Sequence, residues 1–153
     1  MASLNYDDVF SEFLGNIKDP EMGKLDETTA YEIMTEYLHK AVSSVYVRRL
    51  FSSISLDDEV QELTFTMSKK VDDASDEDFV RTMLGKAMAL QWITPQVQSK
   101  VNLAQVFTGS DFKFFSQSNH ISELRAMKSD IEKDLQSFIL TRGYIYNDYL
   151  EDN

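Results

Sequence analysis

The sequence predicts a mainly α fold, a compact bundle of four to five helices with a small β or extended element near residues 62–68 and a C-terminal tail. Three observations lead to this prediction. Apolar residues recur at the three- and four-residue spacing of amphipathic helices along most of the chain. Only two prolines and five glycines interrupt the 153 residues. Between Leu63 and Met67 the apolar residues instead alternate with polar ones, which is the period of a half-buried strand.

We expect one helical domain over residues 1–143 and a tail over residues 144–153. A chain of this length can bury a core without covalent or metal crosslinks. It has no cysteine, which excludes disulfides, thiolate nucleophiles and sulfur-ligated metals and fits a reducing cytoplasm. The first residues show no secretion signal, and no stretch approaches the roughly 18 apolar residues of a membrane span.

Two amphipathic helices are expected in the first third of the chain. The first spans Tyr6–Ile17 and is ended by a loop at residues 18–23. The second begins at Asp26, a good N-cap residue, and reaches about Phe51. Its apolar stripe consists of Ala30, Ile33, Met34, Tyr37, Leu38, Ala41, Val42 and Val45.

Residues 52–74 follow no helical period. We interpret Ile54–Glu59 as a turn with its own apolar anchors. The alternation at residues 63–67 indicates a half-buried strand or an extended loop packed on the helices. Val71–Ala74 is then a polar link to the next helix.

The third long helix is expected to start at Ser75 and to end at Thr94. Pro95 disfavours helical geometry at the residue before it, which predicts the stop. Apolar residues nearly encircle the last turns, so this helix should be central and mostly buried. A further short helix fits residues 96–107.

The last helix is expected to span Asn119–Arg142. Gly143 follows it as the residue type that most readily adopts a left-handed cap. Before it, Gly109–Asp111 is interpreted as a turn. The three phenylalanines within Phe112–Phe115 are interpreted as anchors that close a loop onto the core.

The net charge of −11 and a sequence pI near 4.5 argue against tight binding of nucleic acid. The 26 acidic residues outnumber 15 basic ones, and the basic residues are scattered. Arg48–Arg49 and Lys69–Lys70 are the only basic doublets. A surface that repels DNA is the alternative that this charge leaves open.

The sequence contains no recognisable catalytic or metal-binding motif. His39 and His120 lack a second ligand at metal-binding spacing, so both are interpreted as surface or boundary residues. Glycine-rich phosphate loops and nucleophile elbows are absent. Acidic clusters at loops and helix starts are interpreted as solvated caps: Asp7–Asp8, Asp57–Glu59, Asp72–Asp73, Asp76–Asp78 and Glu151–Asp152. We therefore expect no enzyme activity, no cofactor and no metal.

The tail that follows Gly143 is apolar and aromatic. Chain ends are usually frayed and polar unless a surface holds them. Tyrosine is enriched at interfaces because one end is apolar and the other forms hydrogen bonds. We expect the tail to dock on another subunit; the alternative is that it folds back on its own domain.

Three segments of the chain resemble the head–tail connector (adaptor or neck) proteins of tailed bacteriophages that infect Gram-positive bacteria. Together they contain 45 of the 153 residues. Residues 32–42 look like the long early helix of that family, and residues 76–97 like its central helix with a Trp-Ile-x-Pro ending. Residues 109–120 look like its Asp-Phe-Lys-x-x-Ser-x-x-Asn-His segment, which is the most distinctive of the three.

This resemblance implies a non-enzymatic ring subunit of the virion neck, made in the host cytoplasm. Such rings are typically twelvefold, dock beneath the portal protein, contact a downstream neck or tail protein and let DNA pass without specific binding. The family's C-terminal docking role implies portal-binding or subunit-binding functions for Tyr144, Ile145, Tyr146, Tyr149 and Leu150. Residues 148–153 extend beyond the usual end of the family.

Two other functions remain open from the sequence. One is a different phage stopper or tail-completion protein, a class that tends to be rich in strands. The other is an acidic regulatory or inhibitor protein that binds a basic partner. That function would favour carboxylates along one exposed face, whereas here they cluster at helix starts.

Overall fold

The computed structural model describes residues 2–17, 24–106 and 111–145, with side chains for 2–17, 24–99 and 120–142. In this part of the chain, five helices and three strands follow one another and confirm the predicted mainly α class. Their order is β1 (Ala2–Asn5), α1 (Tyr6–Asn16), α2 (Glu27–Ser43), α3 (Val45–Arg48), β2 (Phe51–Asp57), β3 (Glu62–Met67), α4 (Asp73–Val106) and α5 (Asp111–Ile145).

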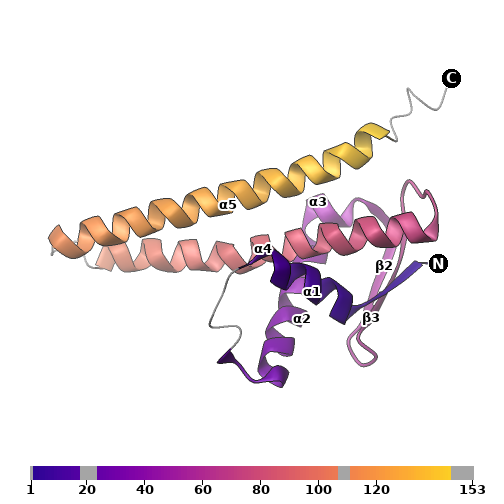
Figure 1. Ribbon diagram of the computed structural model, residues 1–153, viewed down its shortest axis with the longest axis horizontal. Helices are drawn as coiled ribbons and strands as arrows, with labels where there is room; N and C mark the ends of the chain where they lie inside the picture. Colours follow the sequence, from indigo (N-terminus) through magenta and orange to yellow (C-terminus); the bar gives the residue numbers. More distant parts are fainter. Residues whose placement is uncertain (1, 18–23, 107–110, 146–153) are drawn as a thin grey trace.

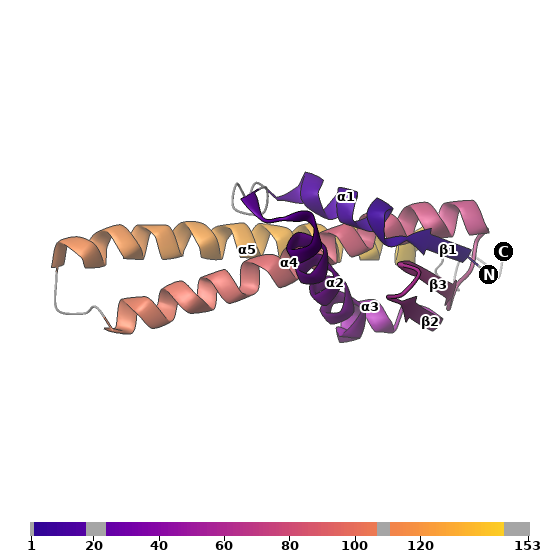
Figure 2. The same ribbon diagram turned by 90° about the horizontal axis from the view of Figure 1, so that it is seen from below.

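Helices α4 and α5 form a long antiparallel hairpin (Figure 1). They contain 34 and 35 residues, so each is about 50 Å long at 1.5 Å per residue. The other elements pack along the half of the hairpin that contains the start of α4 and the end of α5 (Figures 1 and 2). The other half of the hairpin extends beyond them.

The small sheet is antiparallel, with β3 between β1 and β2. Its register pairs Leu4 with Leu63 and Ile54 with Phe65. Leu63, Phe65 and Met67 are buried while the residues between them are not, which confirms the predicted half-buried strand. No periodicity in the sequence predicts β1, because four residues with two apolar side chains are too short to show a period.

Helix α4 lies at the centre of the core, as its apolar pattern predicted. It packs against α1, α2, α5 and β1. Its buried side chains include Val80, Met83, Leu84, Ala87, Met88, Ala89, Trp92 and Ile93. Helix α1 packs on α4 and contributes Val9, Phe10 and Phe13 to the core, at the spacing expected for an amphipathic helix.

The second helix ends earlier than predicted. Asp26 caps α2 as expected, since its carboxylate accepts a 2.8 Å hydrogen bond from the Thr29 amide. However, α2 stops at Ser43, because Ser44 is extended and its hydroxyl and amide both donate to the Ala41 carbonyl. One further helical turn, α3, precedes a strand that starts at Phe51.

The predicted turn at Ile54–Glu59 is also displaced, because β2 continues to Asp57. The Asp57 carboxylate accepts hydrogen bonds from the amides of Glu59 and Val60 in the reversal that follows. Gln61 then adopts a positive φ of 57° before β3 begins. Local side-chain hydrogen bonds and one left-handed residue thus set the position of the turn. Neither feature produces a periodic pattern of apolar residues, so the sequence pattern misplaced the turn.

The third long helix differs from the prediction at both ends. It begins at Asp73 instead of Ser75, because the Asp72 carboxylate accepts a 2.7 Å hydrogen bond from the Ser75 amide and so acts as the cap. Pro95 does not end it: α4 continues to Val106, and residues 96–106 are not a separate helix. Buried Trp92 and Ile93 hold the helix in the core directly before the proline.

The last helix is longer than predicted. It begins at Asp111, so Phe112–Phe115 lie in α5 and not in a loop. Gly143 does not end the helix, which continues to Ile145. The loop predicted at residues 18–23 and most of the turn at Gly109–Asp111 lie outside the described residues.

Gly85 permits the close approach of α4 to α1. A Cβ atom placed on Gly85 would lie 2.7 Å from the Glu12 Cβ and 3.1 to 3.2 Å from backbone atoms of Glu12 and Phe13. We expect Gly85→Ala to destabilise the fold by about 1–3 kcal/mol, since the helices must separate to accept the methyl group. Thermal unfolding monitored by circular dichroism measures this effect.

Gly15 in α1 is the matched control. A Cβ atom there meets nothing within 4 Å, so Gly15→Ala should leave stability unchanged or raise it by up to about 1 kcal/mol through helix propensity. Equal melting temperatures for the two variants would contradict the proposed helix contact.

Candidate functional site

The structure places only part of the predicted docking tail. Tyr144 and Ile145 lie in the last turn of α5, where the backbone alone is described. Tyr146, Tyr149 and Leu150 lie outside the described residues. The role of these five residues therefore stays a prediction.

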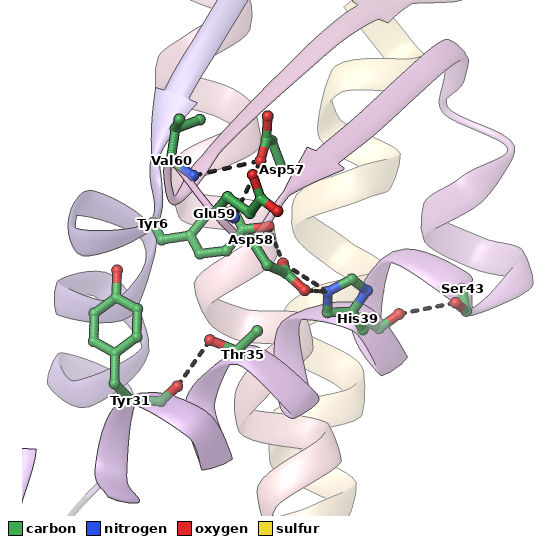
Figure 3. Close-up of polar contacts among 9 residues, drawn as sticks. All are labelled: Tyr6, Tyr31, Thr35, His39, Ser43, Asp57, Asp58, Glu59 and Val60. Atoms are coloured by element: carbon green, nitrogen blue, oxygen red, sulfur yellow. Dashed lines mark hydrogen bonds and ion pairs between the residues drawn. The ribbon is translucent and has the colours of Figure 1, made fainter. Parts of the chain in front are cut away.

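Three polar side chains that are far apart in the sequence meet beside α1, and we call them the Tyr6–Asp58–His39 cluster (Figure 3). The Tyr6 hydroxyl donates a 2.6 Å hydrogen bond to Asp58. The His39 ring places Nε2 at 2.9 Å from both oxygens of the same carboxylate. A carboxylate only accepts, so Nε2 must carry the hydrogen. The cluster joins the start of α1, the middle of α2 and the turn after β2.

The electrostatics of the cluster follow from this geometry. The hydrogen bond from Tyr6, followed by the one from His39, lowers the pKa of the Asp58 carboxyl below its ordinary value. Burial, reinforced by the bond to Asp58, raises the pKa of the Tyr6 hydroxyl. Both effects hold Asp58 ionised and Tyr6 neutral at physiological pH.

The cluster has the chemistry of a structural clamp. A histidine and a carboxylate can activate a nucleophile, but the nearby Ser43 hydroxyl donates to the backbone carbonyl of His39 instead of meeting its ring (Figure 3). A neighbouring hollow of about 600 Å³ is lined by further carboxylates, among them Asp7 and Glu32. Tyr31 also borders it, and burial raises the pKa of its hydroxyl to about 12.

A second feature is a groove of about 300 Å³ between the sheet and the end of α5, which we call the basic groove. It is lined by Arg49, Leu50, Met67, Ser68, Lys69, Ile139, Leu140 and Arg142. The Ser68 amide donates a 2.9 Å hydrogen bond to the Leu50 carbonyl, and Phe51 pairs with Met67. This pairing brings together the two basic doublets, which lie twenty residues apart in the sequence.

Arg142 is fixed in the wall of this groove. Its guanidinium lies 2.7 Å from the Asp76 carboxylate and 3.1 Å from the Lys69 carbonyl oxygen. The side chains of Arg142 and Asp76 are only 12% and 2% exposed. The guanidinium also covers the Phe79 ring at 4.6 Å, and Phe79 stacks on Phe138. The interactions join the start of α4 to the end of α5.

Exposed apolar side chains border the basic groove. Leu140, in the groove itself, is 69% exposed. Tyr46 in α3 is 57% exposed, and the Arg49 guanidinium lies 5.6 Å from the centre of its ring. Large exposed apolar groups beside cations are typical of interaction surfaces.

The sequence indicates some of these residues but not which of them lie close together in the fold. Both basic doublets are visible in the sequence, yet nothing in their spacing predicts that β2 and β3 pair. His39 was interpreted as a surface or boundary residue, and its side chain is indeed 45% exposed. Asp58 is solvated, as predicted for the acidic clusters, but it also binds Tyr6 and His39. Asp76 contradicts the same prediction, because it is buried against Arg142.

The cluster predicts a pH-dependent contribution to stability. We expect Tyr6→Phe to destabilise the fold by about 1–2 kcal/mol at pH 7, since it removes a hydrogen bond to a charged acceptor. Because the pKa of Asp58 is lowered on folding, its contribution is present above the unfolded value near 3.9 and is lost as pH falls through the folded value. Melting temperatures measured from pH 7 to pH 3 should therefore show the gap between wild type and Asp58→Asn closing with acid.

Tyr46→Phe is the control for this series, since Tyr46 is exposed and keeps its ring beside Arg49. Its melting temperature should match that of wild type at every pH. A gap for Asp58→Asn that stays constant down to pH 3 would show that Asp58 contributes no ionised hydrogen bond.

No family model, curated protein or solved structure matches this chain. Among the residues that the structure describes, no helix is both long and apolar enough to span a membrane. The same residues contain no group of three or more His, Cys, Asp or Glu side chains that could hold a metal ion.

Proposed function

We propose that this chain is a non-enzymatic structural subunit of a phage neck, a ring adaptor between the portal and the tail that lines the DNA channel. The observation that carries the proposal is the basic groove with its exposed apolar border on a chain of net charge −11. The resemblance of residues 32–42, 76–97 and 109–120 to neck proteins supplies the biological setting.

The charge distribution supports assembly into a ring. Five of the 15 basic residues gather near the groove: Arg48, Arg49, Lys69, Lys70 and Arg142. Lys70 is paired there with Asp73. Arg142 is likewise paired with Asp76, so cations predominate on this surface but are not alone there. A surface on which cations predominate, on a chain of the opposite net sign, favours contact between two different faces of identical subunits. Such head-to-tail contacts form closed rings when their rotation closes.

The acidic balance of the rest of the chain supports a channel that does not hold DNA. Carboxylates outnumber cations by 26 to 15, so phosphates passing along most of the surface would be repelled. In the proposed ring, of twelve subunits by analogy with the family, the tail that begins at Tyr144 contacts the portal or the adjacent subunit. The opposite side of the ring meets a downstream neck or tail protein.

Disruption of the gene in the phage that encodes it tests this function. We expect negative-stain images of the lysate to show filled or leaking heads and free tails but few joined particles, because the neck lacks its adaptor. Supplying the wild-type chain from a plasmid should restore joined particles and so excludes damage to neighbouring genes. Normal tailed particles without the chain would contradict the proposal.

A further inference from the structure

We propose that the basic groove of one copy holds residues 146–153 of a neighbouring copy. The proposal rests on the proposed function, because it takes the partner to be a second copy in an assembly. It deepens that function by naming the surface and the segment that would join adjacent subunits.

The groove has a basic border around an apolar floor, and one of its three cations, Arg142, already pairs with the buried Asp76 carboxylate. Arg49, Lys69 and Arg142 border it, and Leu50, Met67 and Ile139 line it. Leu140 is exposed within it, and the exposed Tyr46 ring lies beside Arg49 at its border. An occupant that fits must therefore combine carboxylates with large apolar or aromatic groups.

Residues 146–153 have this chemistry. Their sequence, Tyr-Asn-Asp-Tyr-Leu-Glu-Asp-Asn, contains three carboxylates and no cation. Tyr146, Tyr149 and Leu150 supply the apolar groups between them. Tyrosine suits such a site because its ring packs on apolar and cationic side chains while its hydroxyl remains solvated. The carboxylates of Asp148, Glu151 and Asp152 then face the cations of the groove.

The direction of α5 favours a neighbouring copy over the same copy. Ile139 and Leu140 line the groove, and α5 carries the chain onward to Ile145 before residues 146–153 begin. A segment that leaves the helix in this direction would have to reverse at once to enter its own groove. Eight extended residues reach about 28 Å at most, which is enough to cross to an adjacent subunit.

A titration by nuclear magnetic resonance tests the contact. A synthetic peptide of residues 143–153 is added at up to millimolar concentration to the full isotope-labelled chain. We expect saturable amide shifts at Arg49, Leu50, Ser68, Lys69 and Leu140, and at least tenfold weaker binding when salt rises from about 0.05 to 0.5 M. A peptide with Asp148→Asn, Glu151→Gln and Asp152→Asn should bind at least tenfold more weakly.

Matched variants locate the site. Arg49→Glu and Leu140→Asp change exposed groups of the groove and should each weaken peptide binding at least tenfold. Lys133→Glu reverses an exposed charge on α5 outside the groove and should leave binding within twofold. Unchanged amide spectra away from the substituted residue confirm that each variant is folded.

The full chain with Tyr149→Ser and Leu150→Ser distinguishes binding between two copies from binding within one copy. At low micromolar concentration its groove resonances should match those of wild type, because the contact forms between copies. Different groove resonances at every dilution would show that the segment binds its own copy and would overturn the proposal. Absence of saturable shifts at the groove, with matching groove spectra in this variant, would also overturn it. If the groove proposal fails in this way, the neck function is still supported when disruption of the gene abolishes joined particles.

Discussion

The buried ion pair between Asp76 and Arg142 is the interaction on which the arrangement of this fold depends. Asp76, in the first turn of α4, is nearly inaccessible to water, and its Oδ1 lies 2.7 Å from the Arg142 Nη2 in the last turns of α5. A buried charge is costly unless it is paired and hydrogen-bonded. The Val71 amide also donates to this carboxylate, so the chain between β3 and α4 is held as well. The pair thus fixes the relative position of three segments, a role of specificity more than of stability.

Weaker interactions along the hairpin follow from that position. One turn from the pair, the rings of Phe79 and Phe138 stack with 5.1 Å between their centres. Further along, the Lys86 ammonium lies 2.6 Å from the Asp134 carboxylate. The basic groove exists because α5 ends beside the β2–β3 pair, with Arg142 donating to the Lys69 carbonyl. The surface proposed for assembly is therefore a consequence of the contacts that hold the end of α5 against the start of α4.

Sequence patterns predicted the helices and strands better than the residues at which these end or the tertiary contacts between them. The half-buried strand at Leu63–Met67 and the central place of α4 followed from apolar periodicity, which burial imposes directly. The stops predicted at Pro95 and Gly143 were wrong, since α4 and α5 continue past them. At Pro95, buried Trp92 and Ile93 before the proline and Val97 packed on the core after it outweigh the local preference of the proline. The Tyr6–Asp58 bond and the Asp76–Arg142 pair join residues 52 and 66 positions apart. No local pattern encodes such contacts, so the groove could not be predicted before the topology was known.

A double-mutant cycle on the ion pair tests this account most directly. Free energies of unfolding are measured for Asp76→Asn, Arg142→Met and the double variant, with the exposed Glu36–Lys40 pair as reference. Because each single change leaves a buried charge without its partner, we expect each to cost about 3–5 kcal/mol and the double variant to cost no more than either. The exposed pair should couple by no more than about 0.5 kcal/mol. Additive costs at Asp76 and Arg142, with a coupling as small as that of the exposed pair, would contradict the claim that this pair closes the hairpin.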